Sequence, residues 1–174
     1  MALRGVLFVV LICGGAGRGL AQLYGRPQGP TEARAATRHK INKDLFEIDE
    51  LARELERALS SSTPGDLAKA AKHAGKIAKL SHDAWKNLQG GKSSRPDPKL
   101  DPKPQPRPLA EATAEAAALR ALLDEIRRGV AVQQRTQTVD ARLTLELVEK
   151  LERLELAARR LEIDAGERTA DSHR

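Results

Sequence analysis

The side chains best suited to metal binding or proton transfer are four histidines, His39, His73, His82 and His173. His73 and His82 are nine residues apart, so a single helix places them on nearly opposite sides. His39 and His82, on two neighbouring helices, come nearest to forming a metal site. Metal sites usually show clustered ligands at short, regular spacing, and this sequence has no such cluster. We therefore expect exposed histidines, with no metal and no cofactor.

Carboxylate pairs such as Asp49 with Glu50 and Asp124 with Glu125 alternate with lysines and arginines in helical segments. A catalytic carboxylate needs a pocket that shifts its pKa. The chain is only 2% aromatic and 31% charged, so it has few large side chains with which to build a pocket. A Ser/His/Asp arrangement and a glycine-rich phosphate loop are also missing from the sequence. We expect no enzymatic activity, no catalytic residue and no small-molecule substrate.

The N-terminus has the pattern of an export signal. Arg4 precedes the apolar run Val6–Cys13, and the small residue Ala21 follows at a suitable distance for cleavage. The apolar run is too short for a membrane-spanning helix, which needs about 20 apolar residues. We expect residues 1–21 to be a signal peptide and the mature chain to be exported to the periplasm or the extracellular space. The alternative is a lipid anchor at Cys13.

Residues 22–30 are rich in glycine and proline and predict a disordered lead-in. Residues 31–89 then show two helical patterns. The first has large apolar residues alternately four and three apart: Ile41, Leu45, Ile48, Ala52, Leu55 and Leu59. The second repeats this spacing with smaller residues: Leu67, Ala70, Ala74, Ile77, Ser81, Ala84 and Leu88. Three serines and a Thr63-Pro64 helix start separate them, which predicts an antiparallel helical hairpin.

Residues 90–108 contain six of the nine prolines of the chain. Proline lacks an amide hydrogen and fixes φ, so neither a helix nor a central strand can continue through this stretch. We expect an extended, proline-rich linker between two helical parts.

Residues 109–165 carry a heptad pattern that is apolar at both ends and polar in the middle, at Gln133, Gln137 and Asp140. Because the heptad frame continues across this polar part, we favour one long helix. The alternative is a break near residues 129–138, which gives a helix pair and a four-helix bundle. Residues 166–174 are expected to be an irregular tail. In either case the predicted fold is all-α.

Basic residues outnumber acidic ones, and the formal net charge is +6. Lys72, Lys76 and Lys79 lie on one face of the second predicted helix and form a candidate basic surface. Such a surface can make peripheral contact with an anionic membrane or bind an acidic polymer, although lysine rows of this density are common on helices and a solvated face is the simpler explanation. Nucleic acid is an improbable partner, because no aromatic side chains are interspersed to stack on bases.

The C-terminal segment carries an apolar stripe that nothing in its own half covers: Leu147, Leu151, Leu154, Ala158 and Leu161. An exposed stripe of this kind marks a partner surface. We expect self-association or a protein partner there, although folding back onto the hairpin would also cover it.

Two short runs carry a resemblance to a known group, Asp49–Leu55 (DELAREL) and Lys76–Leu80 (KIAKL). With the basic start at Arg38 and the glycines at the end of the hairpin, this third of the chain resembles short exported bacterial helical-hairpin proteins of unknown function. The resemblance implies a hairpin and export but no activity, and the long C-terminal segment is an addition to the group's pattern.

Three hypotheses for function follow. The first is a non-enzymatic envelope protein that acts through helix-mediated interaction or self-association. The second is a periplasmic chaperone-like module that holds client proteins on an amphipathic face. The third is binding of a polyanion or of anionic lipid by the basic second helix and the linker.

Overall fold

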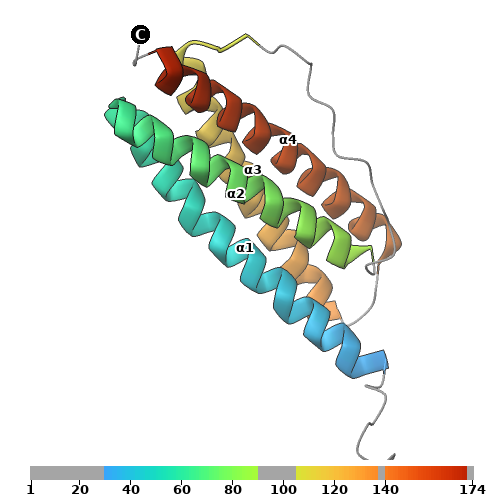
Figure 1. The fold of residues 1–174 in the computed structure, drawn as a ribbon. Helices are drawn as coiled ribbons and strands as arrows, with labels where there is room; N and C mark the ends of the chain where they lie inside the picture. Colours follow the sequence, from blue (N-terminus) through green and yellow to red (C-terminus); the bar gives the residue numbers. More distant parts are fainter. Residues whose placement is uncertain (1–29, 90–104, 137–139, 172–174) are drawn as a thin grey trace, which may run out of the picture.

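The computed structural model describes residues 30–89, 105–136 and 140–171, and all regular structure within these ranges is α-helical. The helices are α1 (Pro30–Ser61), α2 (Pro64–Leu88), α3 (Leu109–Thr136) and α4 (Ala141–Asp171). They lie side by side as an elongated four-helix bundle (Figure 1). The all-α prediction is confirmed. The predicted signal peptide, most of the lead-in and linker residues 90–104 lie outside the described residues.

Each helix packs against two others, and α2 and α3 occupy opposite corners of the bundle. α2 contacts α1 and α4, and α3 contacts the same two helices. Side-chain pairs show that α2 and α4 are antiparallel, because His82 meets Glu155 while the later residue Trp85 meets the earlier residue Glu152. α2 ends at one end of the bundle and α3 begins at the other (Figure 1).

The predicted hairpin of α1 and α2 is present, and its turn follows from its sequence. Ser62 adopts a left-handed conformation with φ of 55°, which lets the chain leave α1 sharply. The Thr63 hydroxyl then accepts a hydrogen bond of 3.2 Å from the amide of Asp66, and Pro64 occupies the first turn, where it costs no helical hydrogen bond. The large apolar residues of α1 pack on the small residues of α2, as their spacing predicted.

The prediction of one long C-terminal helix is wrong, and the alternative four-helix bundle is correct. α3 ends at Thr136, and Asp140 caps the start of α4: its carboxylate accepts hydrogen bonds from the amides of Arg142 at 2.8 Å and Leu143 at 3.2 Å. A continuous helix would leave both apolar ends of the segment in water. A hairpin turns both ends toward one core. The predicted tail also begins too early, because α4 continues through Gly166 to Asp171.

The core runs along the bundle axis and consists of leucine, isoleucine and alanine. Leu45, Leu55, Ile77, Leu123 and Leu154 are among its fully buried side chains. None of the helices in the described part of the chain has the length and apolarity needed to span a membrane.

Candidate binding surface

The three lysines predicted as a basic surface, Lys72, Lys76 and Lys79, are all exposed on the outward side of α2. Their spacing keeps them within about 60° of one another around the helix. None of them has an ion-pair partner among the described residues, and the same is true of Lys86, about two turns beyond Lys79. We call these four residues the lysine face. From Lys72 to Lys86 it extends about 21 Å along α2.

Cations on α3 and α4 are arranged differently, because several of them reach a carboxylate. Arg127 lies 3.3 Å from Asp49, and Lys150 lies 2.8 Å from Glu125 across the α3–α4 contact. The hydrogen bond from Lys150 lowers the pKa of Glu125. These charges are neutralised within the chain, whereas those of the lysine face are available to a partner.

The lysine face carries no large apolar side chain. Between its lysines lie Gly75 and Asp83, and beside it on α4 is Glu162, whose carboxylate occupies the space that a side chain at position 75 would need. Together with Lys79 and His82 these residues line a shallow hollow of about 390 Å³. The surface can attract a negatively charged partner, but it cannot insert into hydrocarbon.

The leucines predicted to mediate self-association are not on the surface. Leu147, Leu151, Leu154 and Leu161 are each at most 1% exposed, and they pack inside the bundle. The prediction of a partner surface at this stripe is therefore wrong. The chain folds α4 back onto the hairpin, which buries the stripe without a second molecule. Sequence spacing identifies a buried face, but it does not say which helix covers that face.

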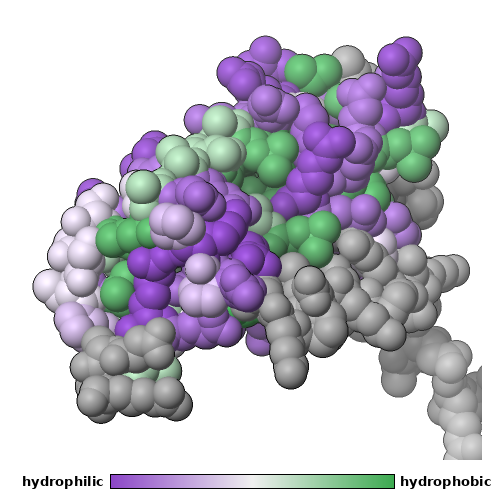
Figure 2. Space-filling view, turned by 90° about the horizontal axis from the view of Figure 1, so that it is seen from above, coloured by the Kyte–Doolittle hydropathy of each residue, from purple (hydrophilic) through white to green (hydrophobic). Residues whose placement is uncertain are grey.

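Exposed apolar residues are few among the described residues. Phe46 on α1, Val132 on α3 and Leu145 on α4 are the large apolar side chains that remain mostly exposed. On the face drawn in Figure 2, hydrophobic residues form separate patches interrupted by hydrophilic ones. This distribution gives little support to a client-binding apolar surface.

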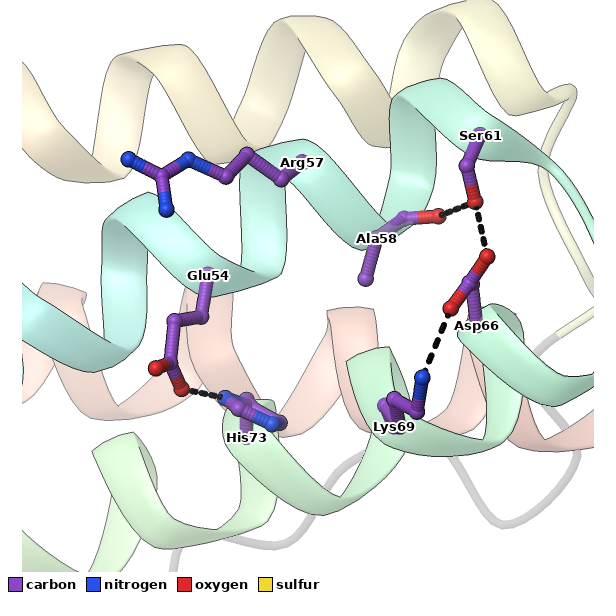
Figure 3. A pocket seen from close by; sticks show the side chains of 7 residues that line it. All are labelled: Glu54, Arg57, Ala58, Ser61, Asp66, Lys69 and His73. Carbon is purple, nitrogen blue, oxygen red and sulfur yellow. Dashed lines mark hydrogen bonds and ion pairs between the residues drawn. The ribbon is translucent and has the colours of Figure 1, made fainter.

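The histidines do not come together. His73 Nδ1 lies 2.9 Å from a Glu54 carboxylate oxygen across the α1–α2 contact (Figure 3). His82 instead faces α4, where its Nδ1 is 3.4 Å from Glu155 and its ring stacks on Trp85. His39 is exposed near the start of α1. Among the described residues no group of three or more potential ligands is placed to hold a metal ion.

Figure 3 shows the hollow beside the α1–α2 turn, which measures about 440 Å³. Asp66 accepts hydrogen bonds there from the hydroxyls of Ser61 and Thr63 and from Lys69. These bonds, that from Ser61 first, hold the pKa of Asp66 well below its ordinary value. The cluster closes the turn, so we assign it a structural role.

Sequence patterns did not reveal two buried carboxylates of α4. Glu155 is fully buried and binds Arg159 at 3.0 Å; the four-residue spacing identifies this pair but suggests an exposed face. Asp164 is also buried and accepts hydrogen bonds of 2.9 and 2.7 Å from the guanidinium of Arg107. Arg107 also pairs with Glu115. No sequence signal indicates this site, because Arg107 stands in a stretch that predicts only an extended spacer.

No family model, curated protein or solved structure matches this chain. The resemblance to exported helical-hairpin proteins therefore stays a prediction.

Proposed function

We propose that this chain is an exported, non-enzymatic helical bundle that binds anionic phospholipid surfaces through the lysine face of α2. The observation that supports the proposal is the row of four exposed lysines without ion-pair partners among the described residues. Export rests on the sequence pattern of Arg4, Val6–Cys13 and Ala21. Leu147, Leu151, Leu154 and Leu161 are buried, so they form no part of the proposed binding surface.

The shape of the lysine face favours a flat partner. The lysines stand on the outward ridge of a straight helix, so a plane can touch all four at once. Each lysine near an anionic bilayer contributes about 1 kcal/mol of attraction, and salt screens this term. Because the ridge has no large apolar side chain, binding stays electrostatic and reversible.

The test is cosedimentation of the chain with vesicles of phosphatidylglycerol and phosphatidylcholine, at low and at high salt. We expect the triple variant Lys72→Ala, Lys76→Ala, Lys79→Ala to bind on the order of 100-fold more weakly, from about 1 kcal/mol per lysine. A matched control replaces three exposed cations that are paired within the chain, Lys69, Arg142 and Arg153.

The control variant loses the same charge and should bind within a few-fold of the parent chain. Equal weakening of both variants would mean that overall charge, and not the lysine face, attracts the vesicles. Binding to soluble polyphosphate without binding to vesicles would identify a linear polyanion as the partner in place of a membrane.

A further inference from the structure

A histidine stands in the row of lysines that forms the lysine face. Lys72, Gly75, Lys79, His82 and Lys86 are spaced three, four, three and four residues apart, so they follow one another along one side of α2. His82 and Lys79 also line the same shallow hollow between α2 and α4. The proposed binding surface therefore includes a position whose charge depends on pH, because histidine is the side chain that gains a proton between about pH 8 and pH 5.

The groups around His82 include more acids than cations. Its own helix contributes Lys79 and Asp83, and α4 contributes Glu152, Glu155, Arg159 and Glu162. Four carboxylates against two cations mean that the acids outnumber the cations by two while the His82 ring is neutral. An anionic bilayer is attracted least at this part of the surface, and a proton on His82 adds one positive charge there.

The contact with α4 accommodates the protonated ring without rearrangement. Nδ1 of His82 lies 3.4 Å from Oε2 of Glu155, whereas Arg159 binds Oε1 of the same carboxylate at 3.0 Å. Each cation thus has its own oxygen of Glu155. The side chain of Glu155 is only 1% exposed, but that of His82 is 27% exposed. The ring therefore exchanges a proton with water, and its charge acts on a bilayer that rests on the lysines beside it.

We infer that protonation of His82 regulates membrane binding, so that the lysine face binds anionic phospholipid more tightly at acidic than at neutral pH. The inference rests on the proposed function, because it concerns the same surface. A neutral ring interrupts the positive charge between Lys79 and Lys86, and a protonated ring makes it continuous. One added unit charge near an anionic bilayer strengthens binding by about five-fold.

The first experiment measures cosedimentation of the full chain with vesicles of phosphatidylglycerol and phosphatidylcholine at about pH 7.5 and about pH 5.5. Both lipids keep their charge over this range, so only the protein changes. We expect the parent chain to bind about five-fold more tightly at the lower pH. His82→Gln keeps a polar side chain but cannot gain a charge, so its binding should differ by about two-fold or less between the two pH values.

His73→Gln is the matched control. It removes a titrating ring from the same helix, but His73 faces α1, where it lies 2.9 Å from Glu54 (Figure 3). This variant should keep the response of the parent chain to pH. Circular dichroism should show the same helicity for the parent chain and both variants, because each substitution leaves a residue that a helix accepts.

Trp85 supplies a second measurement that needs no lipid. It is the only tryptophan of the chain, and its ring stacks on that of His82 with the centroids 5.6 Å apart and 25° between the planes. A protonated imidazole quenches the emission of a stacked indole more strongly than a neutral one does. The fluorescence of the parent chain should therefore fall as the pH decreases from about 8 to about 5. This step should be absent from His82→Gln.

The possible results separate this inference from the proposed function. A parent chain that binds the vesicles at neither pH overturns the proposed function, and the inference with it. A parent chain that binds equally well at both pH values overturns the inference alone, and so does a His82→Gln variant that keeps the full response. Tryptophan emission that stays constant over the same pH range also overturns the inference, because His82 then takes up no proton.

Discussion

Helices α2 and α4 pack against each other along the bundle, yet they carry their charges in different ways. On α4, Arg153, Arg159 and Arg160 each lie near a carboxylate four residues earlier or later on the same helix. Among the lysines of α2, only Lys69 reaches a carboxylate on its own helix, that of Asp66 three residues earlier. Charged side chains that form ion pairs within the chain contribute to the stability of the fold. Exposed lysines without such a pair remain available to bind a negatively charged partner.

Burial decides which of these charges matter for stability. Exposed ion pairs contribute about 0.5 kcal/mol or less, and the pair of Arg153 with Glu149 is of this kind. Asp164 is different: it is fully buried and holds Arg107 in place. Removing one partner of a buried pair leaves an uncompensated charge or an unfilled site. The comparison of α2 with α4 can therefore be tested by substitution.

The largest effect on the stability of the fold is expected from Asp164→Ala. The substitution removes both hydrogen bonds to the guanidinium of Arg107 and leaves that partly buried charge without Asp164, although Glu115 still lies beside it. The free energy of unfolding should fall by about 3 kcal/mol, as measured by urea denaturation. Glu149→Ala on the same helix is the control and should cost about 0.5 kcal/mol or less. Equal losses in both variants would contradict the distinction between buried and exposed pairs.

Asp44→Asn is expected to change the free energy of unfolding by a smaller amount and in the opposite direction, so that the fold becomes more stable. Asp44 is buried on α1, and its Oδ2 has no hydrogen-bond partner. Burial raises the pKa of Asp44 above 3.8, with Lys40 opposing and Asp83 reinforcing the shift. The folded state therefore binds the proton more tightly than the unfolded state, so the carboxylate destabilises the fold at neutral pH.

The asparagine variant should gain about 1 kcal/mol at pH 7. The gain should vanish near pH 3, where Asp44 is protonated in both states. Thermal unfolding at the two pH values measures the difference. A gain that is the same at both values would show that charge at Asp44 is not its cause.

The smallest effect on stability is expected for the lysine face. The triple alanine variant of Lys72, Lys76 and Lys79 should unfold within about 0.5 kcal/mol of the parent chain, because exposed side chains without partners contribute little. Its loss of vesicle binding would then reflect the surface and not the fold. A loss of several kcal/mol would instead assign these lysines a structural role and weaken the proposed function.

The hairpin of α1 and α2 was predictable because its signals are local. Thr63 caps α2, Pro64 follows at the first turn, and the alternating spacing from Ile41 to Leu59 marks the buried face. The exposed positions of Lys72, Lys76 and Lys79 follow from the same spacing. Local patterns of this kind predict the structure well because a helix cap or a buried face depends on only a few neighbouring residues.

The C-terminal half was harder to predict because the decisive contacts lie far apart in the sequence. Asp140 fits both a polar layer in a continuous helix and a helix cap, and the structure shows it as a cap. Leu154 fits both a dimer surface and a core, and the helix that covers it is specified by tertiary packing. Arg107 and Asp164 are 57 residues apart, so no periodic pattern connects them.

The bundle consists of two hairpins, α1 with α2 and α3 with α4, and this division predicts the order of folding. Each hairpin joins helices that are neighbours in the sequence, so it closes a short loop at little entropic cost. Docking of one hairpin on the other must bring together residues such as Trp85 and Glu152, 67 apart, and Glu56 and Arg120, 64 apart. We expect the two hairpins to form early and to dock late. Because the cost of closing a loop rises only by about 0.6 kcal/mol for each doubling of its length, the proline-rich linker can be lengthened with little effect on the docked state.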